Sequence, residues 1–157
     1  MTIDDLTVNF RHLDRETLLE EWGWLIGPTR HPIILTALGN AFVQDVEDDA
    51  ILFVDTGKGE LYDVADTPAE LMERLKEKDF VVDHFDVQMV GDLRLAGKVL
   101  EHDQIYSFIV PLFLGGEYVI ENVEQSSLEV HFSLSGQLCR QIQDLPPGTS
   151  VGAITIE

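Results

Sequence analysis

Histidine and carboxylate residues are the side chains of this sequence that could hold a metal ion for hydrolytic chemistry. His84 lies two residues before Asp86, and His102 directly precedes Asp103. Imidazole and carboxylate groups are the usual ligands of a catalytic zinc ion. Residues two apart on a helix, however, point about 200° away from each other, so His84 and Asp86 are not expected to share one ion. The spacing favours surface side chains, and a metal-assisted hydrolase that uses His84, Asp86, His102 and nearby acids is kept as an alternative function.

A run of acids from Asp45 to Asp49 resembles the start of a calcium-binding loop. The sixth position of that loop would be Ala50 where glycine is needed, and the twelfth would be Thr56 where a bidentate glutamate is needed. The run therefore predicts a solvated hairpin turn between two strands.

Nucleophilic catalysis would require an activated serine or cysteine with a base in reach. Cys139 follows His131 by eight residues, about 12 Å along a continuous helix, which is too far for direct contact. The sequence holds no Gly-x-Ser-x-Gly elbow, phosphate-binding loop or dinucleotide fingerprint. We therefore expect no catalytic residue, no metal, no cofactor and no enzymatic activity.

Charge is the outstanding property of the composition. The 157 residues include 29 Asp and Glu against ten Lys and Arg, for a net charge of -19. Such a field repels polyanions, which argues against nucleic acid and anionic lipid as partners. Beyond Lys98, Arg140 is the only Lys or Arg. The acids either keep the protein in solution or steer a cationic partner towards it.

Localisation is predicted from the absence of two sequence signals. No run of about 20 apolar residues is present, and the first residues lack the basic and apolar regions of a signal peptide. The lone Cys139 cannot form an internal disulfide, which agrees with a reducing compartment. We expect a cytoplasmic protein with no membrane contact.

Hydrophobic periodicity predicts a single compact α+β unit over residues 1–157, with an antiparallel, sheet-rich N-terminal half packed with a helix-rich C-terminal half. Residues 126–144 fit either a strand or a helix, and the helix is favoured because Ser126 and Glu129 can form a capping box. Three helices are expected over residues 14–27, 79–97 and 126–144, and a fourth is expected to begin within residues 66–70. The expected strands span residues 33–37, 41–46, 51–54, 60–64, 105–110 and 151–156.

Several segments resemble a known family. Leu18–Gly27 and Phe53–Leu61 are similar to the first half of the GAD-like immunity proteins. Ala96–Leu100, Tyr106, Pro111–Tyr118, Glu121-Asn122, and Gly136–Leu138 through Leu145–Gly148 resemble the C-terminal domain of type VI secretion immunity proteins that neutralise DNase toxins. The resemblance divides the chain into sub-halves at 1–78 and 79–157.

The resemblance implies an immunity protein that binds and neutralises a co-produced bacterial toxin, plausibly a nuclease. A nuclease attracts phosphate, so an acidic inhibitor can occupy its cationic cleft. A general protein-interaction module is the other alternative function. The residues expected to contact the cationic toxin, chosen from charge and turn placement, are Asp45, Glu47, Asp48, Asp49, Glu117, Tyr118, Glu121 and Glu124.

Overall fold

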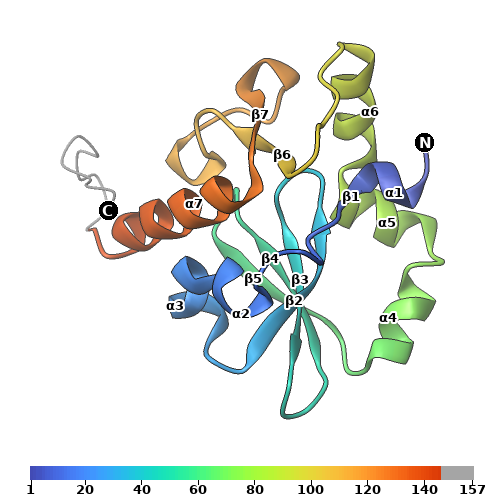
Figure 1. The fold of residues 1–157 in the computed structure, drawn as a ribbon, viewed down its shortest axis with the longest axis vertical. Helices are drawn as coiled ribbons and strands as arrows, with labels where there is room; N and C mark the ends of the chain where they lie inside the picture. The colour runs from blue at the N-terminus through green and yellow to red at the C-terminus, as the bar shows by residue number, and fades with distance from the viewer. Residues whose placement is uncertain (146–157) are drawn as a thin grey trace.

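A five-stranded antiparallel sheet organises the N-terminal half of the computed structural model, which describes residues 1–145 (Figure 1). The strands lie in chain order, so the predicted meander is confirmed. They are β1 (Thr7–Val8), β2 (Arg30–Thr36), β3 (Ala41–Asp45), β4 (Ile51–Asp55) and β5 (Glu60–Ala65).

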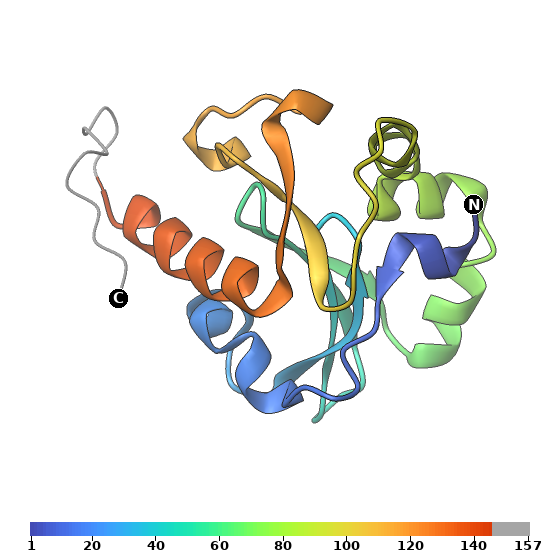
Figure 2. The same ribbon diagram turned by 45° about the horizontal axis from the view of Figure 1, so that its top comes forward.

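The two central strands are apolar on both sides because helices cover both faces of the sheet (Figure 2). Phe42 and Phe53 point to one face, while Val43 and Val54 point to the other, and all four are buried. This arrangement explains why β3 and β4 lack the alternation of an open antiparallel sheet.

Short helices from the N-terminus and from the middle of the chain cover the Phe42 face. They are α1 (Ile3–Leu6), α4 (Pro68–Arg74), α5 (Lys78–Phe85) and α6 (Val87–Leu95). The prediction of one helix over 79–97 was wrong, because Asp86 has a left-handed backbone (φ 51°) that separates α5 from α6. Aspartate tolerates this conformation better than most residues, and the hydrophobic spacing continues across the break.

The Val43 face is covered by α2 (Arg15–Leu18), the 3₁₀ turn η1 (Glu20–Trp22), α3 (Gly23–Ile26) and α7 (Leu128–Gln143). Asp14 caps α2 as predicted, but the expected continuous helix over 14–27 is broken into three pieces. Trp22 is fully buried, and its indole N–H donates to Ser135 Oγ at 3.3 Å. Burial of this indole under α7 thus stabilises the broken segment more than a regular helix over residues 14–27 would.

A second sheet pairs β6 (Gln104–Phe108) with β7 (Val123–Ser127). Between them the chain makes an excursion, residues 109–122, that contains the 3₁₀ turns η2 (Leu112–Leu114) and η3 (Ile120–Asn122). The favoured helix near 126–144 is confirmed as α7, but Ser127 caps it by accepting from Val130 N, and Ser126 belongs to β7. The predicted strand at 151–156 lies outside the described residues.

Buried His131 of α7 joins the two sheets. Its Nε2 lies 2.8 Å from Gly39 O and its Nδ1 lies 2.9 Å from Ser107 Oγ, so Nε2–H donates to the carbonyl and Nδ1 accepts from the hydroxyl. Burial lowers the pKa of His131 to about 4. The imidazole is therefore a neutral structural group, and its contacts are with the β2–β3 turn and β6 instead of Cys139.

The helices that the structure describes include none long and apolar enough to cross a bilayer.

Candidate functional site

A pocket of about 350 Å³ opens where the β4–β5 turn meets the helix break and the excursion. The excursion is attached to this turn by a hydrogen bond of 2.9 Å from Phe113 N to Gly57 O. The buried part of the lining combines two apolar side chains, Leu38 and Phe53, with the Asn40 amide, and several of the other lining residues are charged. The lining residues are Leu38, Asn40, Phe53, Asp55, Lys58, Asp83, Asp86, Phe108, Leu112 and Tyr118.

Two partly buried carboxylates give this pocket unusual electrostatics. Asp86 stands at the helix break, where burial raises its pKa to about 6, and the nearby charge of Asp55 adds to the increase. Burial also raises the pKa of Asp55, although the Lys58 backbone N–H donates to its Oδ1 at 3.0 Å and opposes the shift. The charge of Lys58 lowers the pKa of both carboxyls but does not cancel the effect of burial. At neutral pH the Asp86 carboxylate is charged in a site that solvates it poorly, so a further cation placed there would be stabilised.

Tyr118 connects the excursion to the helix break. Its hydroxyl donates to Asp86 Oδ1 at 2.5 Å, and its ring lies against Phe108 with centroids 5.9 Å apart. Burial and the Asp86 contact both raise the pKa of the phenol. Because half of the side chain remains exposed, Tyr118 offers an aromatic surface beside the acids. Tyr118 is one of the residues expected from the sequence to contact the toxin, and here it stands at the mouth of the pocket beside Asp86.

Side chains of Asn122 and Lys98 hold the backbone of the excursion and its junction with β7 by hydrogen bonds. The Asn122 amide donates to Val110 O and Glu117 O, each at 2.9 Å, while its oxygen accepts from Val110 N. Lys98 Nζ donates to the carbonyls of Ile120 and Val123. The resemblance motif therefore holds mainly structural residues, and the acids between them point to solvent: Glu117, Glu121 and Glu124 are exposed.

The second predicted group of acids lies in the β3–β4 turn. Glu47, Asp48 and Asp49 are exposed there, as a solvated hairpin requires. Asp45 is buried, and its carboxylate accepts from Thr29 Oγ1 and from Glu47 N and pairs with Arg30 Nε at 3.3 Å. Its carboxylate is therefore occupied by groups at the start of β2 and in the turn.

The structure does not bring the two groups of acids together. The β3–β4 turn is at one end of β4, and the β4–β5 turn, which contacts the excursion, is at the other. Five residues of extended strand separate the ends by about 16 Å. In Figure 1 the β3–β4 turn accordingly lies at the bottom of the molecule, and the segment between β6 and β7 lies near the top.

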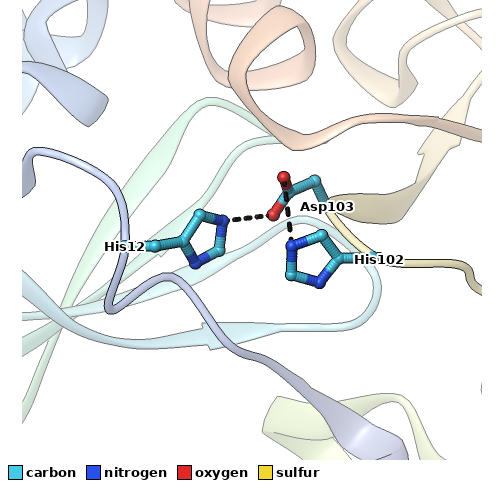
Figure 3. Close-up of side chains that lie close together, drawn as sticks. All are labelled: His12, His102 and Asp103. Carbon is cyan, nitrogen blue, oxygen red and sulfur yellow. Dashed lines mark hydrogen bonds and ion pairs between the residues drawn. The ribbon is translucent and has the colours of Figure 1, made fainter.

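The metal cluster considered from the sequence is not assembled. His84 donates through Nδ1 to Phe80 O at 2.9 Å and stacks on the Phe80 ring, apart from His102. Among residues 1–145, the histidine, cysteine and carboxylate groups close enough together to share an ion are His12, His102 and Asp103 (Figure 3). His12 was missed because it is 90 residues from His102 in the sequence, and no local pattern relates the two.

Comparisons with known proteins support part of the resemblance. Residues 65–139, just under half of the chain, match the family model described as type VI secretion (T6SS) immunity protein Tdi1, C-terminal. No curated protein matches this chain. The fold is similar to the crystal structure of Atu4351 from Agrobacterium tumefaciens, with a TM-score of 0.51 and 14% identity. That similarity covers 80% of this chain and 65% of the other, so this chain spans less than two thirds of the Agrobacterium protein's length.

Proposed function

We propose that this protein is a type VI secretion immunity protein that binds and neutralises a cationic bacterial toxin of the nuclease class. The match of residues 65–139 to an immunity-protein family carries the proposal. A nuclease toxin acts on DNA inside the cell, so the proposed place of action is the cytoplasm. In this proposal residues 1–78 correspond to the GAD-like half, and the chain acts by binding, without catalysis.

The acidic pocket and the excursion form the proposed toxin-binding surface. Asp83, Asp86, Tyr118 and the exposed acids of the excursion all lie within the segment that matches the family model. The acids of the β3–β4 turn lie outside that segment and at the opposite end of the sheet. A lysine or arginine of the toxin that enters the pocket would offset the cost of the poorly solvated carboxylates, and Tyr118 would pack against its aliphatic stem.

The biological test is rescue from the toxin encoded beside this gene. The neighbouring effector is expressed in a bacterial host with and without this chain, and complex formation is measured with the purified pair. Rescue of growth together with a stable complex is expected. If the neighbouring genes encode no product that this chain binds, the toxin assignment is wrong, and the partner recovered from the native cell would identify a general interaction module instead.

The binding surface is tested with two charge-matched variants. The excursion variant carries Glu117→Gln and Glu121→Gln in the excursion and Glu124→Gln at the adjoining start of β7. The turn variant carries Glu47→Gln, Asp48→Asn and Asp49→Asn in the β3–β4 turn. Both variants remove three negative charges. A difference between their rates of association with the toxin therefore depends on where the charges lie, because the net charge of the two variants is the same. The amides keep the hydrogen-bond acceptors of the turn, where Ala50 N donates to Asp48 Oδ1 at 3.0 Å.

We expect the excursion variant to associate about tenfold more slowly at low salt and to show a weaker salt dependence, because steering depends on complementary charge near the contact. The turn variant should associate nearly as fast as the parent. The reverse order would move the interface to the β3–β4 turn and refute the proposed surface.

A further inference from the structure

A second cluster, which shares no residue with the acidic pocket, is formed by His12, His102 and Asp103 (Figure 3). His12 Nε2 lies 2.5 Å from Asp103 Oδ1, and His102 Nε2 lies 3.5 Å from Oδ2. Ligand atoms of the three residues lie within 4.8 Å of one another. Ligands of one zinc ion, with bonds of about 2.0–2.2 Å, are separated by about 3–4 Å, so small side-chain rotations would bring these atoms into coordinating positions.

Backbone contacts hold the cluster in place from two distant segments. His12 lies in the connection between β1 and α2, where Leu13 N donates to Phe10 O at 3.0 Å. Asp103 has a left-handed backbone (φ 63°), and its carbonyl accepts from Leu128 N at 2.9 Å. The fold thus places the His12 ring against the His102 ring, with centroids 4.9 Å apart.

The ligand types specify the class of ion. Two imidazoles and one carboxylate suit zinc and neighbouring transition metals, whereas magnesium and calcium prefer oxygen ligands alone. The protein's charge of -19 also raises the local concentration of divalent cations. A simple ion pair needs only one histidine, whereas here both rings direct Nε2 to opposite oxygens of the same carboxylate.

We propose that His12, His102 and Asp103 form a surface site for Zn²⁺ or a similar transition-metal ion, with solvent completing the coordination. The bound ion links the β1–α2 connection to the start of β6, two segments about 90 residues apart in the sequence. The site goes beyond the toxin-binding function and does not depend on it. It also differs from the expectation of no metal that the sequence supported.

The test is titration of the untagged full chain with Zn²⁺, followed by calorimetry and thermal unfolding. His102→Ala removes a ligand whose side chain is 78% exposed, so the fold should be kept. Asp103→Asn removes the charge, and asparagine tolerates the left-handed backbone. His31→Gln in β2 is the matched control, because it removes a histidine that is outside the cluster.

We expect one Zn²⁺ per chain, a higher midpoint of thermal unfolding with Zn²⁺, and no effect of Mg²⁺. His102→Ala and Asp103→Asn should each weaken Zn²⁺ binding by about tenfold or more, and His31→Gln should bind as the parent does. Absence of stoichiometric binding, or equal binding by His102→Ala and the parent, would overturn the site.

Discussion

Replacing Asp86 by asparagine should raise stability and lower toxin affinity at the same time. Asparagine tolerates the φ of 51° at the helix break, and its Oδ1 can still accept from the Tyr118 hydroxyl. The substitution therefore removes the charge while keeping the backbone and the hydrogen bond. Its effect isolates the cost of an ionised carboxylate in this pocket.

The magnitude follows from the pKa of Asp86, which burial raises from 3.8 to about 6. A carboxyl whose folded-state pKa is raised binds more protons when folded, so its contribution to stability falls as pH rises from about 4 to about 6 and is constant above. Raising a pKa from 3.8 to about 6 corresponds to about 3 kcal/mol. Asp86→Asn should therefore gain up to about 3 kcal/mol at pH 7.5, and the gain should shrink by about 1 kcal/mol on going down to pH 5.

Urea unfolding of Asp86→Asn and the parent at several pH values between 5 and 8 measures this difference. Asp63→Asn is the control, because Asp63 is exposed on β5, and we expect a change within about 0.5 kcal/mol. An Asp86→Asn variant that gains nothing at pH 7.5, or gains equally at pH 5 and pH 7.5, would refute the desolvation argument.

Toxin binding gives the second readout of Asp86→Asn. If a toxin cation offsets the buried charge, the more stable variant should bind about tenfold or more weakly, since truncating a buried charge pair typically costs about 2–5 kcal/mol and asparagine keeps part of the contact. Higher stability with unchanged affinity would place Asp86 outside the interface.

Two pairs of glycine substitutions test the packing that positions the site, each by urea unfolding. Gly136→Ala should cost about 1–3 kcal/mol because its Cβ would lie 2.6 Å from a backbone oxygen of η1, whereas Gly91→Ala, with its nearest contact at 3.7 Å, should be neutral or gain up to about 1 kcal/mol. Gly39→Ala should cost about 3 kcal/mol or more, since φ is 82° and Cβ would lie 2.4 Å from a nitrogen of the buried imidazole. Gly97→Ala has a similar φ of 85° but open space, so it should cost only about 1–2 kcal/mol. Equal losses within either pair would contradict the packing argument.

The sequence alone determined the features that depend on neighbouring residues. Alternating and continuous apolar runs separated by turn residues predicted four strands of the meander, and Asp14 and Pro68 marked helix starts that the structure confirms. Composition supplied the strong negative charge. These properties were readable because turn chemistry and periodicity act over a few residues.

Tertiary structure decided which residues share a site. The break at Asp86 interrupts a hydrophobic spacing that continues across it, and only the folded chain brings Tyr118 to that break from 32 residues away. His12 meets Asp103 across 91 residues for the same reason. These long-range contacts depend on which helices cover each face of the sheet. The packing of the whole core decides that arrangement, and no local sequence pattern specifies it.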